Sequence, residues 1–355
     1  MHTGRLVHTG QVVLDLVMRV PALPPVGGDV FATESSLQPG GGFNVMAAAA
    51  RAGADVVYAG GHGDGQLGDA VRGALAAEGI MAALVPSVGV DTGVSVAMVD
   101  DLGERTFVTA AGAESALDPA QLAAVPITAA DIVYLSGYSL VAEAKRDALL
   151  DWLDRLPRRA AGSEPRGLAD GTGAPGPANG TTAGPRGLAN GTGAPGPADG
   201  TGPLVLVDPG PLVAEIAPAA WARVLERVDV LSCNAREARL LTGLPGAGEA
   251  CRALGGWVGA AASVLVRDGA AGCWLARGGV LTSIPGVPVT AVDTNGAGDA
   301  HCGVLAAELL RGADLAAAAV RANAAAALAV TRPGPATAPT RAEVDALLAG
   351  GRGVG

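Results

Sequence analysis

A run of small residues that ends in a carboxylate is the part of this sequence best suited to chemistry. The segment Asp293–Asp299 reads Asp-Thr-Asn-Gly-Ala-Gly-Asp and leads directly into an apolar, helix-forming stretch, 300–310. Small residues ahead of a helix leave backbone N–H groups free for an anion, and the helix dipole adds to the attraction. Such a turn suits the charge on a phosphoryl group in transfer, and Asp299 would accept a proton from an attacking hydroxyl group. A short glycine-rich turn is often only a helix cap, but the seven-residue motif is far more specific than that.

A second glycine-rich segment lies about 250 residues upstream. It runs Gly-Gly-Gly-Phe-Asn-Val-Met-Ala-Ala-Ala-Ala-Arg-Ala-Gly over 40–53 and is followed by Gly-Asp-Gly-Gln-Leu-Gly over 63–68. Together with Asp293–Asp299 it resembles the signatures of the ribokinase family of sugar kinases, also called the PfkB family. Three further matches come in the expected order: Asn-Ala-Arg-Glu over 234–237, Val-Arg-Asp-Gly-Ala-Ala-Gly over 266–272, and Asn-Ala-Ala-Ala-Ala over 323–327. The resemblance covers nearly the whole chain except 162–202.

The resemblance implies a role for each matching residue. Asp299 matches the catalytic base, and its anion hole is matched by Gly296, Ala297 and Gly298. The positions that bind substrate hydroxyl groups are matched by Asp15, Gly41, Gly42, Asn44 and Asp293. The nucleotide side is matched by Asn234, Glu237, Arg267, Gly269 and Asn323. Carboxylates and an amide are the groups that recognise a polyol, and Glu237 would hold Mg²⁺ through water. The implied cofactors are therefore ATP and Mg²⁺, with a monovalent cation left open.

Departures from the family pattern bear on the substrate. The family often has a lysine within its first glycine-rich segment, where this chain has Gly41, and members that act on phosphorylated sugars use a cation near that point. The resemblance therefore favours an unphosphorylated sugar such as ribose or fructose. A nucleoside stays open, although the chain offers few aromatic residues to hold a base: Phe31, Phe43, Phe107 and Tyr138. Arg267 stands where threonine or serine is frequent in the family.

Two other classes of nucleotide-binding enzyme fit the sequence less well. Gly63, Gly65 and Gly68 have the spacing of a dinucleotide fingerprint, with Asp91 at about the right distance for a ribose. An NAD(P)-dependent oxidoreductase is nevertheless disfavoured, because Asp91 falls in a turn before a hairpin rather than in a βαβ unit. A P-loop kinase needs a lysine in its glycine-rich loop, but the chain's one lysine, Lys145, lies in a helical stretch.

Strand and helix patterns alternate along most of the 355 residues, which predicts an α/β fold with a mainly parallel sheet covered by helices on both faces. Predicted strands are 6–20, 29–38, 56–59, 80–85, 132–135, 204–208, 230–232 and 264–267. Predicted helices are 43–52, 67–78, 142–156 and a long tail from 300 onward. A hairpin over 94–109 and the early strands should form a small β-lid from about 10–40 and 90–115. The resemblance implies the same three-layer, ribokinase-like architecture in a single kinase domain, with ATP lying across the carboxyl ends of the strands.

The segment 162–202 breaks this scheme. Residues 165–184 are nearly repeated by 185–204, and both copies are rich in glycine and proline without apolar periodicity. Such a segment buries too little apolar surface to offset its ordering entropy, so we expect a disordered insertion.

Composition limits the partners and the compartment. A formal net charge of −10 disfavours nucleic acid and anionic membranes. Four widely spaced cysteines suggest free thiols rather than a zinc site or disulfides. We read no secretory signal and no apolar run long enough for a membrane helix. The expectation is a soluble cytoplasmic protein that binds a small-molecule sugar, with a homodimer through the lid implied by the resemblance alone.

Overall fold

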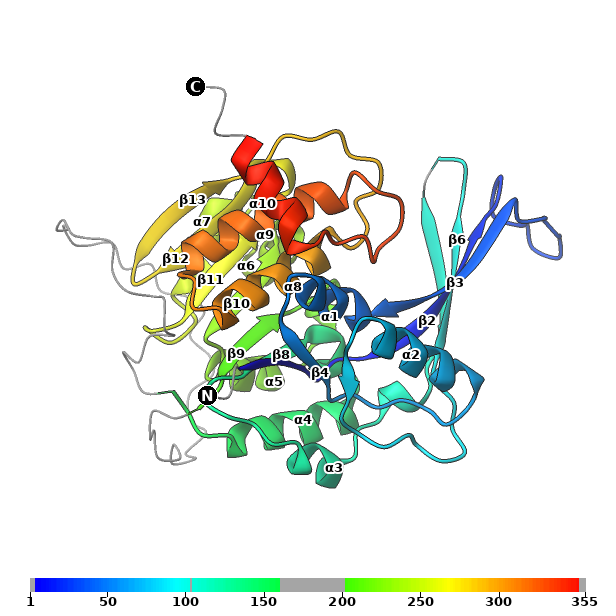
Figure 1. The fold of residues 1–355 in the computed structure, drawn as a ribbon, viewed down its shortest axis with the longest axis horizontal. Coiled ribbons are helices and arrows are strands. Elements are labelled where there is room, and N and C mark those ends of the chain that lie inside the picture. The colour runs from blue at the N-terminus through cyan, green and yellow to red at the C-terminus, as the bar shows by residue number, and fades with distance from the viewer. Residues whose placement is uncertain (1–3, 103, 160–201, 351–355) are drawn as a thin grey trace.

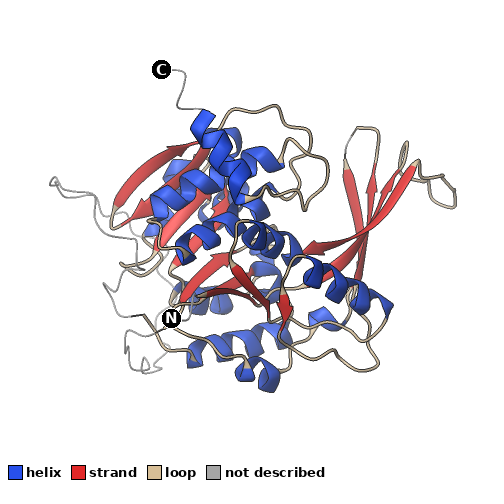
Figure 2. Ribbon diagram, in the orientation of Figure 1, coloured by secondary structure: helices blue, strands red, loops and turns tan. Residues whose placement is uncertain are grey.

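The computed structural model describes residues 4–102, 104–159 and 202–350. They form a body, in which one large sheet lies between two layers of helices, and a smaller β-sheet that projects from the body, the lid (Figures 1 and 2). The predicted disordered insertion, 162–202, lies outside the described residues except for Gly202. Within the described ranges, no helix is both long and apolar enough to cross a membrane.

Among the described residues the body sheet has nine strands, and seven neighbouring strands pair with one another in parallel. The strand order is β13-β12-β11-β10-β9-β8-β1-β4-β5, and at one edge β12 pairs antiparallel with both β11 and β13. The strands are β1 (Arg5–His8), β4 (Asp55–Tyr58), β5 (Met81–Ala82), β8 (Ile132–Ser136), β9 (Leu204–Asp208), β10 (Val230–Asn234), β11 (Ser263–Arg267), β12 (Gly272–Arg277) and β13 (Val280–Pro285). This arrangement confirms the predicted mainly parallel sheet.

Helices cover both faces of this sheet. They are α1 (Gly42–Arg51), α2 (Gln66–Ala77), α3 (Pro119–Ala124), α4 (Glu143–Arg155), α5 (Pro218–Leu225), α6 (Ala235–Thr242), α7 (Ala247–Gly255), α8 (Ala297–Leu310), α9 (Leu315–Ala329) and α10 (Arg341–Gly350), with short 3₁₀ turns η1 (Ala113–Ser115), η2 (Gly137–Leu140), η3 (Val213–Glu215) and η4 (Gly269–Ala271). The predicted helical tail from 300 onward consists of three separate helices. They are α8, α9 and α10, and the first break follows from Gly312, whose positive φ angle comes just after the end of α8.

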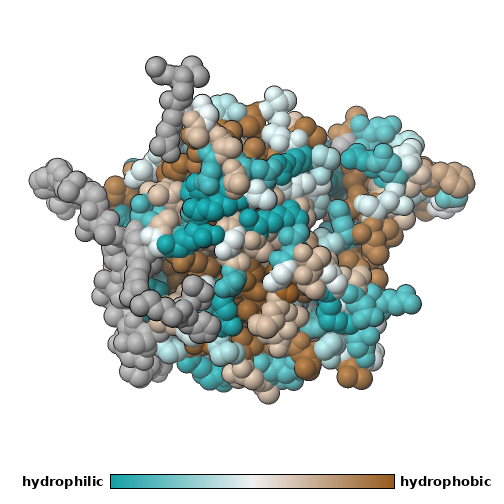
Figure 3. All heavy atoms as spheres, viewed as in Figure 1, coloured by the Kyte–Doolittle hydropathy of each residue, from teal (hydrophilic) through white to brown (hydrophobic). Residues whose placement is uncertain are grey.

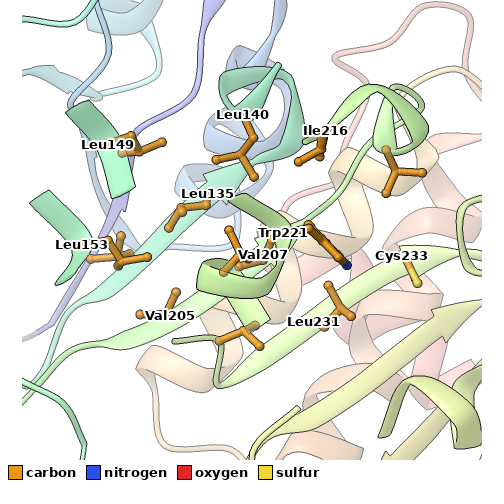
Figure 4. Close-up of a cluster of buried hydrophobic side chains, with 14 of the residues drawn as sticks. Leu135, Leu140, Leu149, Leu153, Val205, Val207, Ile216, Trp221, Leu231 and Cys233 are labelled. Carbon is orange, nitrogen blue, oxygen red and sulfur yellow. The ribbon is translucent and has the colours of Figure 1, made fainter. Parts of the chain in front are cut away.

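Strand residues alternate between two hydrophobic cores, one on each face of the body sheet. Val205 and Val207 of β9 pack into one core, whereas Leu204 and Leu206 pack into the other. Figure 4 shows part of the first core, where Leu149 and Leu153 of α4 approach the strands. Because both faces are buried, the parallel strands are continuous apolar runs rather than alternating ones.

In the part of the chain that the structure describes, the lid is a separate four-stranded sheet of order β3-β2-β6-β7. Its strands are β2 (Val12–Arg19), β3 (Glu34–Gly41), β6 (Val94–Val99) and β7 (Arg105–Ala110). They fall within the predicted lid ranges, apart from the last residue of β3. Two strand predictions are corrected. The strand expected over 6–20 is two strands in different sheets, since the chain leaves the body at Gly10. The strand expected over 29–38 begins at Glu34, opposite Arg19 at the end of β2, and so the residues before it have no partner strand.

Candidate active site

The turn before α8 leaves unpaired backbone donors at the start of the helix. Gly296 has φ +76°, and a Cβ there would lie 1.9 Å from the carbonyl oxygen of Pro335, so only glycine fits. Ala297 N–H donates to Thr294, and the next backbone hydrogen bond is from Ala300 to Gly296. The N–H groups of Gly298 and Asp299 therefore have no backbone partner among the described residues. Free N–H groups at a helix start form a site for an anion.

Asp299, in the first turn of α8, lies beside these donors. Its Oδ2 accepts a hydrogen bond of 3.0 Å from the side-chain amide of Asn44 in α1. Burial raises the pKa of Asp299 to about 6, with the negative charge of Asp208 adding to the increase and the Asn44 bond opposing it. A carboxylate with this pKa is ionised at neutral pH and still basic enough to take a proton.

Three adjacent parallel strands end in polar residues next to this turn. Asp208, Asn234 and Arg267 are the last residues of β9, β10 and β11. Both terminal nitrogens of the Arg267 guanidinium lie 3.0 Å from Asp208 Oδ2, and Nη1 also lies 3.1 Å from Ser232 Oγ and 2.7 Å from Cys302 Sγ. A Cβ on Gly298 would lie 3.6 Å from the guanidinium carbon, so a buried positive charge sits directly behind the anion-binding turn.

Glu237 belongs to this group but is already engaged in local structure. It forms a capping box with Asn234, in which Asn234 N–H donates to Glu237 Oε2 at 2.8 Å and Glu237 N–H donates to Asn234 Oδ1 at 2.9 Å. Its carboxylate lies 3.7 Å from Arg267, and burial together with the Asp208 charge raises its pKa.

Mg²⁺ fits these donors only if water and phosphate complete its shell. No cluster of three or more His, Cys, Asp or Glu side chains in the described parts of the chain could hold a metal ion. Two neighbouring carboxylates, Asp208 and Glu237, are nevertheless oxygen donors of the kind Mg²⁺ prefers, and this ion keeps several waters in enzymes that use nucleotide phosphates. The four cysteines are all buried free thiols, as the sequence predicted.

A cavity of about 250 Å³ lies between the inner face of the lid and the body. Asp15 and Gln38 line it from the lid, and Asp293 and Asn295 line it from the loop before α8. Burial raises the pKa of Asp15 to about 6. Asp293 Oδ1 accepts a 2.8 Å hydrogen bond from Arg105 Nη2, which spans from the lid to the body. The structure thus brings Asp15 and Asp293 to one cavity.

The other predicted residues take different positions. Gly41 and Gly42 form the junction of β3 and α1, two residues before Asn44, and neither lines this cavity. Gly269 faces open space in η4, after the end of β11. Asn323 is buried, and its amide donates to the carbonyl oxygens of Ile284 and Pro285 at the end of β13, so its described contacts are structural.

Three residues near the site were not predicted to take part in it from their sequence context. Asp208 carries a weak signal, since it ends an apolar strand. Arg105 carries none, because its partner is 188 residues away. Tyr138 was considered only as an aromatic residue that could hold a base. Burial is the main cause that raises its pKa, and four nearby carboxylates add to the increase: Asp299, Asp208, Glu237 and Asp15. One ring therefore lies within electrostatic reach of carboxylates from both the lid and the body.

The residues with dinucleotide-fingerprint spacing have a structural explanation. Asp91 accepts hydrogen bonds from the N–H groups of Leu67 and Gly68 in the first turn of α2, at 3.0 and 2.8 Å. A Cβ on Gly68 would lie 2.1 Å from the carbonyl oxygen of Gly63. Asp91 thus caps a helix, and the disfavoured oxidoreductase interpretation loses its ribose contact.

Comparisons with known proteins show the family of this chain and its fold. A family model described as pfkB family carbohydrate kinase matches residues 4–162 and 201–341, on either side of the duplicated segment. An uncharacterized sugar kinase from Escherichia coli K12, YegV, is 28% identical over 338 residues, which are 94% of this chain and 91% of that protein. Among solved structures, ribokinase from Thermotoga maritima superposes with a TM-score of 0.71 at 21% identity, covering 97% of this chain and 99% of that one. Aminoimidazole riboside kinase from Salmonella enterica gives 0.72 at 22% identity, covering 97% and 100%.

Proposed function

The chain belongs to the pfkB family of carbohydrate kinases, and from this premise we propose that it transfers the γ-phosphoryl group of ATP to a hydroxyl group of a small unphosphorylated sugar. The observation that carries this proposal is the position of Asp299. Its carboxylate, oriented by Asn44, stands beside two unpaired backbone N–H groups at the start of α8. A base and an anion site side by side are what in-line transfer to an alcohol requires.

In the proposed reaction, the acceptor hydroxyl group binds next to Asp299. The carboxylate takes the proton as the acceptor oxygen forms its bond to the γ-phosphorus, and the bond from that phosphorus to the bridging oxygen of ADP breaks. The N–H groups of Gly298 and Asp299 stabilise the negative charge on the phosphoryl oxygens. Asn44 keeps the carboxylate turned toward the acceptor.

The nucleotide would lie along the carboxyl ends of β9, β10 and β11. Arg267, fixed by Asp208, adds a positive charge behind the anion-binding turn. Asp208 and Glu237 would hold Mg²⁺ through water, and the ion, when bound, would neutralise charge on the β- and γ-phosphates. Gly269 and Asn323 are proposed to border the nucleotide on the family resemblance, and a monovalent cation stays open in the same way.

The polar lining of the lid cavity supports a sugar as the acceptor. Asp15, Gln38, Asn295 and Asp293 offer the mixture of donors and acceptors that a polyol needs. Gly41 and Gly42 would approach the substrate from the base of the lid.

The cavity's charges support an unphosphorylated substrate. Of the described residues that line the cavity, two are cationic, and each is paired: Arg19 with Glu34 and Arg105 with Asp293. Neither arginine is therefore a free cation for a sugar phosphate.

A nucleoside is the second candidate acceptor, favoured by one observation. Phe107 of β7 is about half exposed and lines the same cavity, where its ring offers an apolar surface to a base. The aminoimidazole riboside kinase named above acts on a compound of this kind, as its name states.

We also propose a homodimer through the lid. All six residues of β7 are exposed, and Leu37, Phe107 and Val108 expose more than half of their surface on the lid. Exposed apolar residues on a thin sheet favour association with a second copy. Sedimentation of the purified protein would test this proposal, and a monomer at micromolar concentration would reject it.

The test of the proposed activity is a screen that measures ADP formation with free sugars, sugar phosphates and nucleosides. We expect turnover with at least one free aldose or ketose, none with its phosphorylated form, and weak or no turnover with nucleosides. Preference for a nucleoside, lost in Phe107→Ala, would establish the second candidate instead. ADP formation with none of the three classes would reject both.

A further inference from the structure

Over the described ranges, the chain passes between the lid and the body at four points, which we call the crossings. They contain Gly10 before β2, Gly42 after β3, Gly93 before β6 and Gly112 after β7. The crossings pack tightly around two side chains. A Cβ on Gly10 or Gly42 would lie 2.3 or 2.2 Å from Cε1 of His8, and a Cβ on Gly93 would lie 2.4 Å from Oε1 of Glu114. Any movement of the lid relative to the body must pass through these points (Figure 1).

Glu114 ties two of the crossings together. It lies in η1, directly after β7, and only 2% of its surface is exposed. Its Oε2 accepts a 2.7 Å hydrogen bond from Gly93 N–H, and its Oε1 accepts a 2.8 Å bond from Gly112 N–H. Its carboxylate thus accepts one hydrogen bond from the crossing before β6 and another from the crossing after β7.

Lys145 connects this pair of crossings to the one at Gly10. It is the chain's one lysine, it lies on α4, and 2% of it is exposed. Its Nζ donates to the carbonyl oxygen of Glu114 at 2.6 Å and faces that of Gly10 at 3.4 Å. Burial lowers the pKa of Lys145 to about 8, and the charge of Glu114 opposes this decrease. A leucine or methionine would fill this position without the cost of burying an amine, so packing alone does not require a lysine here.

His8 completes the cluster at the two remaining crossings. It is fully buried and stacks on Tyr134 of β8 with ring centroids 4.8 Å apart. Its Nδ1 accepts a 3.1 Å hydrogen bond from Gly10 N–H, and its ring lies against Gly42, whose N–H donates to Gln11 in the first crossing. Gly10 is therefore held at its N–H by His8 and approached at its carbonyl by Lys145.

This cluster is close in sequence to a residue that contacts the proposed catalytic base. Gly42 is the first residue of α1, and two residues later Asn44 bonds to Asp299. On the other side of the same crossing, β3 leads to Gln38 in the lid cavity. A shift at the crossings would move both the acceptor site and the side chain that orients the base.

We propose that Lys145 is a positioning residue that, with Glu114 and His8, locks the four crossings and thereby sets the lid and the first turn of α1 relative to Asp299. It acts on the acceptor site and leaves the nucleotide side, at the ends of β9 to β11, unchanged. The part of this inference that concerns catalysis rests on the proposed function, whereas the part that concerns the lid does not.

The first measurement is hydrogen exchange on the unliganded protein, which is independent of any substrate. In Lys145→Met we expect amides at 9–12, 41–43, 91–94 and 111–114 to exchange about tenfold faster or more, with β8 to β10 unchanged. Arg146→Ala is the matched control, because this neighbour on α4 pairs with Glu143 and Asp147 at the helix surface. Unchanged exchange at the crossings, or equally faster exchange throughout the body, would overturn the proposal.

The second measurement uses the acceptor found in the activity screen. Lys145→Met should raise KM for the acceptor about tenfold or more while KM for ATP stays within about twofold, and Lys145→Arg should recover part of the loss. Equal effects on both KM values would overturn the positioning role. If Lys145→Met does not fold, Glu114→Gln is measured in the same way, because it removes one of the two backbone bonds. If the unaltered protein phosphorylates nothing, the proposed function fails, and the exchange result still decides the role of the lock.

Discussion

The variant Asp299→Asn tests whether the carboxylate of Asp299 serves catalysis or stabilises the fold. If it serves catalysis, the variant should have lower activity and a higher stability than the unaltered protein. Asparagine keeps the size of the side chain and an oxygen that can accept the bond from Asn44, but it cannot take a proton. We expect kcat to fall by about 10²–10⁴-fold, the usual contribution of a positioned base. The KM for ATP should change little, since the nucleotide side is untouched. Turnover in a coupled ADP assay gives both values.

The stability change follows from the pKa. Burial raises the pKa of Asp299 from 3.8 to about 6, so the folded protein disfavours the charged form. This shift corresponds to at most about 3 kcal/mol, and less in practice because the carboxyl group keeps some contact with solvent. The cost of the charge is absent below pH 4 and complete above pH 6. Asp299→Asn should therefore raise the melting temperature by a few degrees at pH 7.5 and leave it unchanged near pH 4.

Calorimetry at the two pH values, beside the kinetic assay, decides the matter. Asn44→Ala is the informative companion, because it removes the orienting bond but keeps the base, and it should lower kcat less than Asp299→Asn does. If Asp299→Asn turned over at a near-normal rate, Asp299 could not be the base. If the variant were instead less stable at pH 7.5, its carboxylate would be a structural partner and the reasoning from burial would be wrong.

Three further predictions concern the pH profile, the lid and the duplicated segment. Burial raises the pKa values of Asp299 and Asp15 to about 6, so kcat/KM should fall below pH 6 and be level from about pH 7 to 8. A value of kcat/KM that is unchanged down to pH 5 would contradict both assignments. Arg105→Ala, which removes the bond from the lid to Asp293, should raise KM for the acceptor by about three- to tenfold and leave KM for ATP unchanged, as measured by initial rates. Replacing 163–200 with a short glycine–serine linker should preserve activity and melting temperature, because the family model matches on both sides of this segment; loss of soluble protein would show that the segment contributes to folding.

The predictions from sequence succeeded where the signal is local. Gly296, Gly298 and Asp299 lie in one continuous segment at the start of α8, so their backbone geometry follows from their own residue types. The buried strands of the body were identified from apolar runs, and the hairpin of β6 and β7 from two alternating runs around a turn. The family resemblance supplied the three-layer architecture, which the topology and the comparisons confirm.

The strand predicted over 6–20 shows where a local signal fails. A strand-like pattern continues through Gly10, but β1 and β2 belong to different sheets. Each of them buries consecutive side chains, Leu6–His8 in β1 and Val12–Leu14 in β2. Periodicity reports which residues of a strand are buried and not which sheet buries them. The strand pairings reveal the break, because β1 pairs with β4 and β8 in the body whereas β2 pairs with β3 and β6 in the lid.

The sequence by itself determined the chemical groups: an anion-binding turn, a carboxylate at its end, and an α/β framework to hold them. Only the tertiary structure decided how those groups are tuned and positioned. Three contacts show this. Arg267 pairs with Asp208, 59 positions away, and Arg105 bonds to Asp293, 188 positions away. Lys145 on α4 bonds to Glu114 at the crossings, 31 positions away. Such contacts have no signature in a single sequence, because the distance between two side chains is set by how the intervening elements pack and not by the residues themselves.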